Sequence, residues 1–271
     1  MKIGVITDIH SNLPALKAVM ERLDELNCDQ IVCCGDMIGI GPYPEETVQF
    51  MLNIPNLIAV RGNHEKYLLE GMPSKYPNEE RMSFEEMKHH KWEHSLLSPS
   101  SVDFLKSLPY RTDTVCEGYS LSVLHYCMDR DGHYIHYKPN PSEKDLKQMF
   151  SHVENEIVLY GHDHQRNICK GDKLYINAGS LGCPAQSRNI ARAGVVSIKP
   201  ENIEVQTIDE HYDASLVVEG LTGCLILMPV TSKSIFTVFG DQTVFGLTVF
   251  VKYMYSFFLK RNNGFVCRNK S

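Results

Sequence analysis

Short apolar runs that stop at a polar residue recur through the first 164 positions of the chain. Residues 2–7, 31–34 and 57–60 are such runs, and their β-branched side chains are typical of buried strands. From Asn12, apolar residues recur at three- and four-residue steps, which predicts an amphipathic helix between the first two strands. Strand and helix therefore alternate, and this order predicts an α/β layered fold with right-handed crossovers.

The rest of the chain contains more strands than helices. A hairpin is expected at 115–124, because Gly118 can supply its turn. Further strands are expected at 157–160, 174–177, 194–198 and 203–208, and further helices at 45–52, 83–97, 100–107 and 142–152. A chain of 271 residues can bury ~75% of the surface that its unfolded form exposes, so this fold needs no disulfide or metal for stability.

Side chains that commonly bind metals follow five of the strand-like runs. They are Asp8 and His10, Asp36, Asn63 with His64, His125, and His162 with His164. Sites in α/β folds form beyond the carboxyl ends of the strands, so we expect these groups to converge. The set offers carboxylate, amide and imidazole donors and no thiolate, which suits Mn, Fe, Zn or Co. It is large enough for two cations, which a bridging carboxylate would hold ~3.5–4 Å apart.

Each of these residues also has an ordinary structural role when it is taken alone. Asp8 and Asn63 suit helix N-caps, and a lone His125 suits a structural strand end. Two histidines two positions apart on one loop, His162 and His164, are harder to explain without a metal. The ordered set at five strand ends favours the metal interpretation over the structural one.

The series resembles the calcineurin-like metallophosphoesterases, and within them the small bacterial and archaeal branch without large inserted domains. The motifs that carry the resemblance are Asp8-Ile9-His10-Ser11-Asn12, Gly35-Asp36-Met37-Ile38-Gly39, Arg61-Gly62-Asn63-His64-Glu65, His125 and Gly161-His162-Asp163-His164. The resemblance covers residues 1–213. It implies a four-layer α/β/β/α sandwich of two mixed sheets flanked by helices, with the metal site at one edge of the sheets.

The resemblance also implies a role for each site residue. The first divalent cation would be held by Asp8, His10, Asp36 and His164, and the second by Asp36, Asn63, His125 and His162. His64 would lie beside the phosphate without binding metal, and would donate a proton to the leaving oxygen or stabilise charge there. Asn12 and Arg61 are candidates for binding substrate, although Arg61 suits a loop-supporting role equally well.

Two positions depart from the family pattern. Tyr126 follows His125, where family members often have glycine, and His133 and His136 lie nearby as alternative ligands. We prefer His125 because an apolar strand ends there. Cys183 stands where a polar residue is expected.

The resemblance implies a phosphoesterase with two divalent cations, Mn²⁺ in first place and Fe, Zn, Co or Ni as alternatives. A water activated by the cations would attack phosphorus in line. We expect a phosphodiesterase on small nucleotide-like substrates. The alternatives are a phosphomonoesterase or phosphoprotein phosphatase, a dinucleoside-polyphosphate hydrolase and, from another class, a non-catalytic metal-binding scaffold. Intact ligands and an intact His64 favour an enzyme over a scaffold.

Charge and cysteine content restrict the partners and the compartment. The formal charge of −6 argues against a dedicated nucleic-acid binder or a protein of anionic membranes, because both need a basic surface. Nine cysteines without a Cys-x-x-Cys spacing suggest buried thiols in a reducing compartment, and no signal-peptide core opens the chain. We therefore expect a cytoplasmic protein whose partner is a small phosphate ester, and homo-oligomerisation stays open.

Two further segments carry expectations. His89, His90 and His94 lie in a charged helical stretch and are expected to be solvated, with no third metal site there. Residues 214–271 form a divergent C-terminal tail in which little helical period is visible, so β-leaning or poorly packed structure is expected. Charged residues interrupt every candidate membrane span in this tail, so no membrane anchor is expected.

Overall fold

The computed structural model describes residues 1–227 except 76, 79–81, 131, 136–137 and 184–188. The chain divides into two units, Met1–Asp213 and Ala214–Ser271, and each is described by itself.

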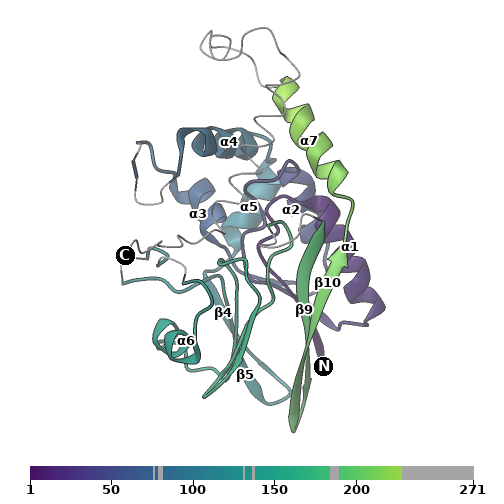
Figure 1. The fold of residues 1–271 in the computed structure, drawn as a ribbon, viewed down its shortest axis with the longest axis vertical. Helices are drawn as coiled ribbons and strands as arrows, with labels where there is room; N and C mark the ends of the chain where they lie inside the picture. The colour runs from purple at the N-terminus through teal and green to yellow at the C-terminus, as the bar shows by residue number, and fades with distance from the viewer. Residues whose placement is uncertain (76, 79–81, 131, 136–137, 184–188, 228–271) are drawn as a thin grey trace, which may run out of the picture. The chain divides into compact units, whose positions relative to one another are not determined.

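Two mixed five-stranded sheets form the centre of the first unit (Figure 1). The first sheet has the order β10 (Asn202–His211), β9 (Ile190–Lys199), β1 (Lys2–Ile6), β2 (Gln30–Cys33) and β3 (Ile58–Ala59). The second has the order β4 (Arg111–Cys116), β5 (Tyr119–Leu124), β6 (Ile157–Tyr160), β8 (Leu174–Asn177) and β7 (Asn167–Lys170). Each sheet has three parallel strands, β1–β2–β3 in one and β5–β6–β8 in the other. The outer pairings, β1–β9–β10 in the first sheet and β4–β5 and β7–β8 in the second, are antiparallel.

Among its described residues, the same unit contains six helices. They are α1 (Leu13–Glu25), α2 (Pro44–Leu52), α3 (Asn63–Glu70), α4 (Phe84–Ser95), α5 (Pro99–Ser107) and α6 (Glu143–Met149). Figure 1 shows α6 beside the β4–β5 hairpin and α1 beside β9 and β10. Several of these helices begin at a polar N-cap residue whose side chain accepts a backbone N–H of the first turn. These residues are Asn12, Ser83, Ser98 and Ser142.

Three apolar clusters separate four layers. Leu16 of α1, Val48 of α2 and Leu105 of α5 pack with the outer face of the first sheet. Alternate residues of the strands, such as Val5 and Leu121, fill the space between the two sheets, because successive strand side chains point to opposite faces. A third cluster, which includes Leu146, Phe150, Val158 and Tyr175, joins α6 to the outer face of the second sheet. The predicted four-layer α/β/β/α sandwich is confirmed.

Some elements differ from the prediction. The helix α3 and the strand β7 were not predicted, and β9 and β10 are longer than expected, with ten residues each. The residues of β7 alternate between half-buried and exposed at the edge of the second sheet, so they form no apolar run. The end of α6 at Met149 leaves the predicted extension to 152 outside the helix.

The described part of the second unit is a helix, α7 (Ala214–Leu227). The β-leaning structure expected for the tail is therefore wrong over these residues. The sequence of α7 is apolar on nearly all sides, so it lacks the one-sided period by which a helix is usually recognised. The rest of the tail, residues 228–271, lies outside the described residues. Within the described part of the chain, no helix combines the length and the apolar character that a membrane span requires.

Candidate metal centre

The loops that follow β1 and β2 are joined by backbone hydrogen bonds. Asp8 N–H donates to the Gly35 carbonyl at 3.0 Å, and His10 N–H donates to the Asp36 carbonyl at 3.0 Å. A similar bond joins the loops of the second sheet, where Gly161 N–H donates to the His125 carbonyl at 2.8 Å. The carboxyl ends of parallel strands meet at one edge, so these bonds hold the predicted residues in neighbouring loops.

One group of candidate ligand atoms surrounds the carboxylate of Asp8. His164 Nε2 lies 3.4 Å and His10 Nε2 lies 3.8 Å from Asp8 Oδ1, and the two imidazole nitrogens are 2.9 Å apart. His10 Nε2 also lies 3.9 Å from Asp36 Oδ2. These four side chains are the ones that the resemblance assigns to the first cation.

A second group surrounds the amide oxygen of Asn63. His162 Nδ1 lies 2.9 Å and His125 Nε2 lies 3.1 Å from Asn63 Oδ1, and the two ring nitrogens are 3.3 Å apart. His125 Nε2 is 3.3 Å from Asp36 Oδ2. Asp36 Oδ2 is thus shared by both groups, as a bridging carboxylate requires.

Neighbouring groups fix which atoms face the centre. Thr7 Oγ1 donates to Asp8 Oδ2 at 2.7 Å, and His162 N–H donates to Asp8 Oδ1 at 3.1 Å and Oδ2 at 3.0 Å. His64 N–H donates to Asp36 Oδ1 at 3.0 Å, so Asp36 turns its Oδ2 toward the centre. His125 Nδ1–H donates to the Cys34 carbonyl at 2.7 Å. In the neutral imidazole that a metal requires, that bond places the lone pair of His125 on Nε2, the nitrogen that faces Asp36 and Asn63.

The spacing of these atoms fits bound cations. Ligands held ~2.0–2.2 Å from one ion lie ~3.0–3.5 Å apart in tetrahedral or cis octahedral positions. The separations here run from 2.9 to 3.9 Å. Imidazoles and carboxylates this close together, with His10, His125, Asp8 and Asp36 buried and His162 and His164 half-buried, are a donor set suited to divalent metals.

The titration of the candidate ligands follows from burial and from their mutual charges. Burial, reinforced by neighbouring histidines, lowers the pKa of His10 to about 4 and that of His162 to about 3. Burial opposes the charge on His125 as well, but Asp36 outweighs it and raises the pKa of His125 to about 9. Burial likewise disfavours ionised Asp36, yet His125 and His64 hold its pKa well below the usual range. Asp36 is therefore an anion at neutral pH.

Five candidate ligands have the left-handed backbone conformation that side chains usually avoid. They are Asp8, His10, Asp36, His162 and His164, with φ between 50° and 78°. Each such residue costs about 1–3 kcal/mol, and such residues concentrate at functional sites. The fold accepts this strain at the residues that would bind the cations.

His64 stands beside this centre at the start of α3. Its Nε2 lies 3.8 Å from Asp36 Oδ2, and its ring is 4.8 Å from the ring of His10. On the other side, a Cβ added to Gly39 would fall 2.0 Å from His64 Nδ1, so glycine at position 39 gives the imidazole its space. His64 therefore lies beside Asp36, the residue shared by both groups of candidate ligands.

The remaining predicted residues have structural contacts. Asn12 caps α1, with Oδ1 accepting from Ala15 N–H at 3.1 Å, and its Nδ2 donates to Tyr212. Arg61 donates from Nε and Nη2 to the carbonyls of Leu108 and Lys106, both at 2.7 Å. These contacts are the ones expected if Arg61 supports the loop. Of the alternatives to His125, His133 is exposed beside Asp129, and His136 lies outside the described residues.

Glu65 is a buried residue to which the sequence assigned no role. Its two carboxylate oxygens accept the backbone N–H groups of Gly62, Asp36, Met37 and Ile38 at 2.7 to 3.2 Å. Glu65 thereby joins the loop after β2 to the start of α3, which carries Asn63 and His64. Burial, together with the charge of Asp36, raises the pKa of Glu65 to about 7. A glutamate three residues after Gly62, the N-cap of α3, can accept the N-cap N–H, and this spacing is the signal that could have found it.

The expectation that the histidines of α4 are solvated is wrong. His89 and His90 are buried and His94 is half-buried. The ring of His90 lies 4.9 Å from that of His64, and Glu93 accepts from Gly39 N–H at 2.5 Å and from Ser11 Oγ. Polar contacts with the loops after β1 and β2 add to the apolar packing of Met87 against Tyr67 and Met82, so polar residues of this helix are buried as well.

The structure also adds a thiol to a donor set that the sequence predicted to be free of thiols. Cys183 is buried, and its Sγ, one ring nitrogen of His10 and one of His164 all lie within 4.8 Å of one another.

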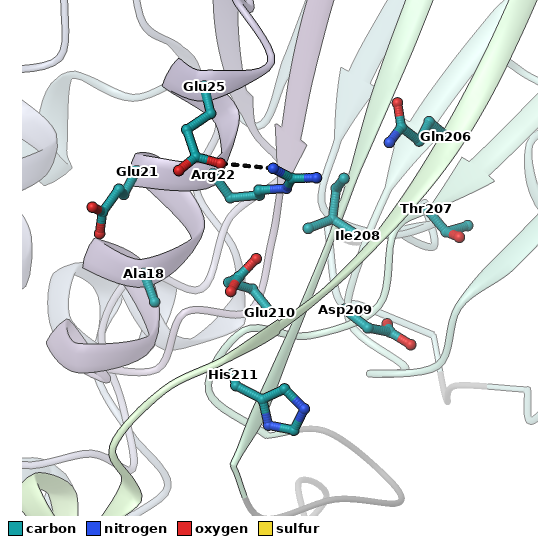
Figure 2. Close-up of a pocket in the computed structure, with 10 residues that line it drawn as sticks. All are labelled: Ala18, Glu21, Arg22, Glu25, Gln206, Thr207, Ile208, Asp209, Glu210 and His211. Carbon is teal, nitrogen blue, oxygen red and sulfur yellow. Dashed lines mark hydrogen bonds and ion pairs between the residues drawn. The ribbon is translucent and has the colours of Figure 1, made fainter.

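A separate hollow lies between α1 and residues 206–211 of β10 (Figure 2). Its volume is about 570 Å³, and none of the predicted site residues lines it. Arg22 and Glu25 form an exposed ion pair of 2.6 Å at its wall. Within the described residues, the groups that could hold a metal lie at the loop centre and not in this hollow.

Comparisons with known proteins agree with this architecture. The model of the calcineurin-like phosphoesterase superfamily domain matches residues 1–201. An uncharacterized protein of Methanocaldococcus jannaschii is 26% identical over 234 residues, which are 76% of this chain and 87% of that protein. Two crystal structures share the fold. A hypothetical protein from Pyrococcus horikoshii has a TM-score of 0.71 at 18% identity, covering 82% of this chain and 92% of its own. A metallophosphoesterase from Sphaerobacter thermophilus has a TM-score of 0.61 at 21% identity, covering 82% and 93%.

Proposed function

Because the chain belongs to the calcineurin-like phosphoesterase superfamily and is therefore a phosphoric ester hydrolase, we propose that it cleaves small nucleotide-like phosphodiesters at a two-metal centre. The family match confirms the resemblance that the loop motifs predict. Family membership also implies divalent metals, and the candidate ligands supply suitable donors for them.

The observation that carries the proposal is the sharing of Asp36. Its Oδ2 lies 3.3 Å from His125 Nε2 in one group of candidate ligands and 3.9 Å from His10 Nε2 in the other. Two groups of four donors with one carboxylate in common are what a pair of cations needs. We assign Asp8, His10, Asp36 and His164 to one cation, and Asp36, Asn63, His125 and His162 to the other.

Cations bound there would neutralise charge on the phosphate and lower the pKa of a water that attacks phosphorus. The protein's own contribution is positional. Thr7 and the His64 backbone orient the two carboxylates, and Cys34 orients His125. His64 would donate a proton to the leaving oxygen or stabilise the charge that develops on it.

The charge of the site supports a diester in preference to a monoester. A monoester dianion is commonly held by the bidentate fork of an arginine. Arg61, the arginine of the site motif, instead donates to the carbonyls of Leu108 and Lys106. Asp8 and Asp36 also offset part of the charge that two cations bring. A diester, with its single negative charge, suits this balance better.

Oxygen and imidazole donors support Mn²⁺ as the first choice, with Fe, Zn, Co or Ni as alternatives. We also propose that residues 1–213 form the catalytic domain. A cytoplasmic location remains a proposal based on the odd number of cysteines, nine, and the absence of a Cys-x-x-Cys spacing.

Hydrolysis of an aryl phosphodiester and an aryl phosphomonoester with Mn²⁺ tests the proposal. Asp36→Asn is expected to lose both bound metal and activity, because it removes the shared carboxylate. His64→Ala should keep its metal and lose ~10²–10⁴-fold in kcat, the usual contribution of a general acid. His211→Ala, which changes an exposed histidine of β10, is the matched control and should behave as wild type.

Three outcomes would contradict, in turn, catalysis at this centre, the substrate class and the role of His64. Equal, metal-independent rates in wild type, Asp36→Asn and His64→Ala would refute catalysis at this centre. A strong preference for the monoester would overturn the assignment of substrate class. Normal activity of His64→Ala would remove its assigned role and leave the metal centre in place.

A further inference from the structure

Cys183 lies in a loop that is fastened to the end of β1. Leu181 N–H donates to the Thr7 carbonyl at 3.2 Å, and Gly182 N–H donates to the Asp8 carbonyl at 2.9 Å. A Cβ at position 182 would fall 2.1 Å from the Ile9 carbonyl oxygen, so only glycine permits this close approach. The loop is therefore held against the segment that carries Asp8 and His10.

The position of Cys183 within this loop is also fixed. Its backbone N–H donates to Ser180 Oγ at 2.8 Å, and Ser180 Oγ in turn donates to the Asp8 carbonyl at 2.8 Å. Cys183 is only 4% exposed. The thiol is thus placed beside the metal loop by backbone and hydroxyl contacts that do not depend on the sulfur.

The sulfur belongs to a compact set of donors. Cys183 Sγ and one ring nitrogen of each of His10 and His164 lie within 4.8 Å of one another. This limit of 4.8 Å brings the thiol and the two imidazoles within reach of one ion. In addition, His10 is 1% exposed, and its Nδ1 has no hydrogen-bond partner within the described residues.

We propose that Cys183 is a thiolate ligand of the first cation, beside His10 and His164. The inference rests on the proposed two-metal centre and extends it to a residue outside the five loop motifs. On binding, the S–H bond breaks, the proton goes to solvent, and the sulfur lone pair forms the bond to the cation.

A sulfur donor makes the two positions of the centre chemically different. The position of Asn63, His125 and His162 has only oxygen and nitrogen donors, whereas the position of His10 and His164 gains a soft ligand. Thiolates favour Zn²⁺, Co²⁺ or Fe over Mn²⁺. The centre is therefore suited to two different metals, with the softer one next to Cys183.

Cobalt substitution tests this inference without an activity assay. The purified full-length chain is stripped of metal and titrated with Co²⁺, while bound cobalt is counted by metal analysis. A near-ultraviolet sulfur-to-cobalt charge-transfer band is expected, and it should saturate with one of two bound equivalents. Cys183→Ser should lose this band, keep the visible cobalt bands and weaken the affinity for one equivalent at least ~10-fold.

Cys127→Ser is the matched control, because Cys127 is buried to a similar degree and belongs to none of the groups of candidate ligands. The control should keep the charge-transfer band. Binding of two equivalents by wild type without the band, or a band that survives in Cys183→Ser, would overturn the role of Cys183 and leave the two-metal centre intact. Failure of wild type to bind cobalt would overturn both. Even if Cys183→Ser does not fold, the wild-type spectrum shows whether a sulfur atom binds the cobalt.

Discussion

Replacement of Gly161 by alanine tests whether the ends of the two sheets meet at the site. Gly161 follows β6 of the second sheet, and an added Cβ would lie 2.0 Å from Thr7 Oγ1 and 2.7 Å from Asp8 Oδ2, beyond β1 of the first sheet. Thr7 is fully buried and donates to Asp8, so the hydroxyl cannot turn away without breaking that bond. The methyl group must therefore push the two loops apart.

The size of the effect follows from these contacts. Overpacking of a buried position costs ~1–3 kcal/mol, and loss of a hydrogen bond to a buried carboxylate costs ~1.5–3 kcal/mol. We expect Gly161→Ala to lower the free energy of unfolding of the metal-free protein by about 2.5–6 kcal/mol, the sum of the two contributions. The displaced Asp8 should also weaken metal binding. Stabilisation by Mn²⁺, about 2.7 kcal/mol for a site at 100 times its Kd, should therefore shrink in the variant.

Urea unfolding with EDTA and with Mn²⁺ measures both effects. Gly194→Ala in β9 is the matched control, because a Cβ there would meet nothing closer than 3.5 Å. That variant should stay within ~0.5 kcal/mol of wild type and gain the full stabilisation by Mn²⁺. If Gly161→Ala is as stable as Gly194→Ala and gains as much from Mn²⁺, the proposed contact between the sheet ends is refuted.

Three further predictions concern protons, the α4 helix and the tail. Because Asp36 raises the pKa of His125 to about 9, and a metal-bound imidazole must be neutral, metal loading at pH 7.5 should release a proton from His125. Calorimetry in buffers of different ionisation enthalpy can count this proton in Cys183→Ser, where no thiol adds a second one; no release there would contradict the prediction. Glu93→Gln should cost about 1–3 kcal/mol in urea unfolding at pH 7, because the carboxylate accepts Gly39 N–H. Burial opposes the ionisation of Glu93, but neighbouring histidines lower its pKa below 4.5. The stability that the Glu93 carboxylate contributes is therefore present above pH 4.5 and is lost as the pH falls through the folded-state pKa. An equal cost of Glu93→Gln at pH 3 would contradict this prediction. Truncation after Asp213 should leave Mn²⁺ binding unchanged in equilibrium dialysis, and a truncated chain that folds but binds no Mn²⁺ would contradict it.

The layers of the fold could be predicted because the central strands are buried on both faces. Every residue of β6 is buried, and so are four of the five in β1, so each strand forms a continuous apolar run in the sequence. Edge elements lack this signal. In β7 the burial alternates between half-buried and exposed, and α3 begins only a few residues after β3 with no apolar repeat before Tyr67.

The groups of candidate ligands could be predicted because each follows a strand, whereas the residues that support them could not. Glu93 contacts Ser11 and Gly39 across 82 and 54 positions of sequence. Cys183 reaches His10 and His164 only because its loop folds back on Thr7 and Asp8. Neither contact leaves a local pattern, so only the tertiary fold reveals a carboxylate under the loops and a thiol beside the centre.

Backbone conformation explains why the loops of the centre need support from elsewhere in the fold. Glycines before Asp36 and His162 suggest that glycine supplies the sharp turns, but the candidate ligands themselves have positive φ, 53° at Asp36 and 78° at His162. Asp8, His10 and His164 add to this strain, which at ~1–3 kcal/mol per residue is comparable to the whole stability of many domains. Hydrogen bonds from distant segments must offset it. Glu65, which accepts four backbone N–H groups, and Glu93 on α4 provide such bonds, so the buried acids outside the ligand set are needed to keep the ligands in place before any cation binds.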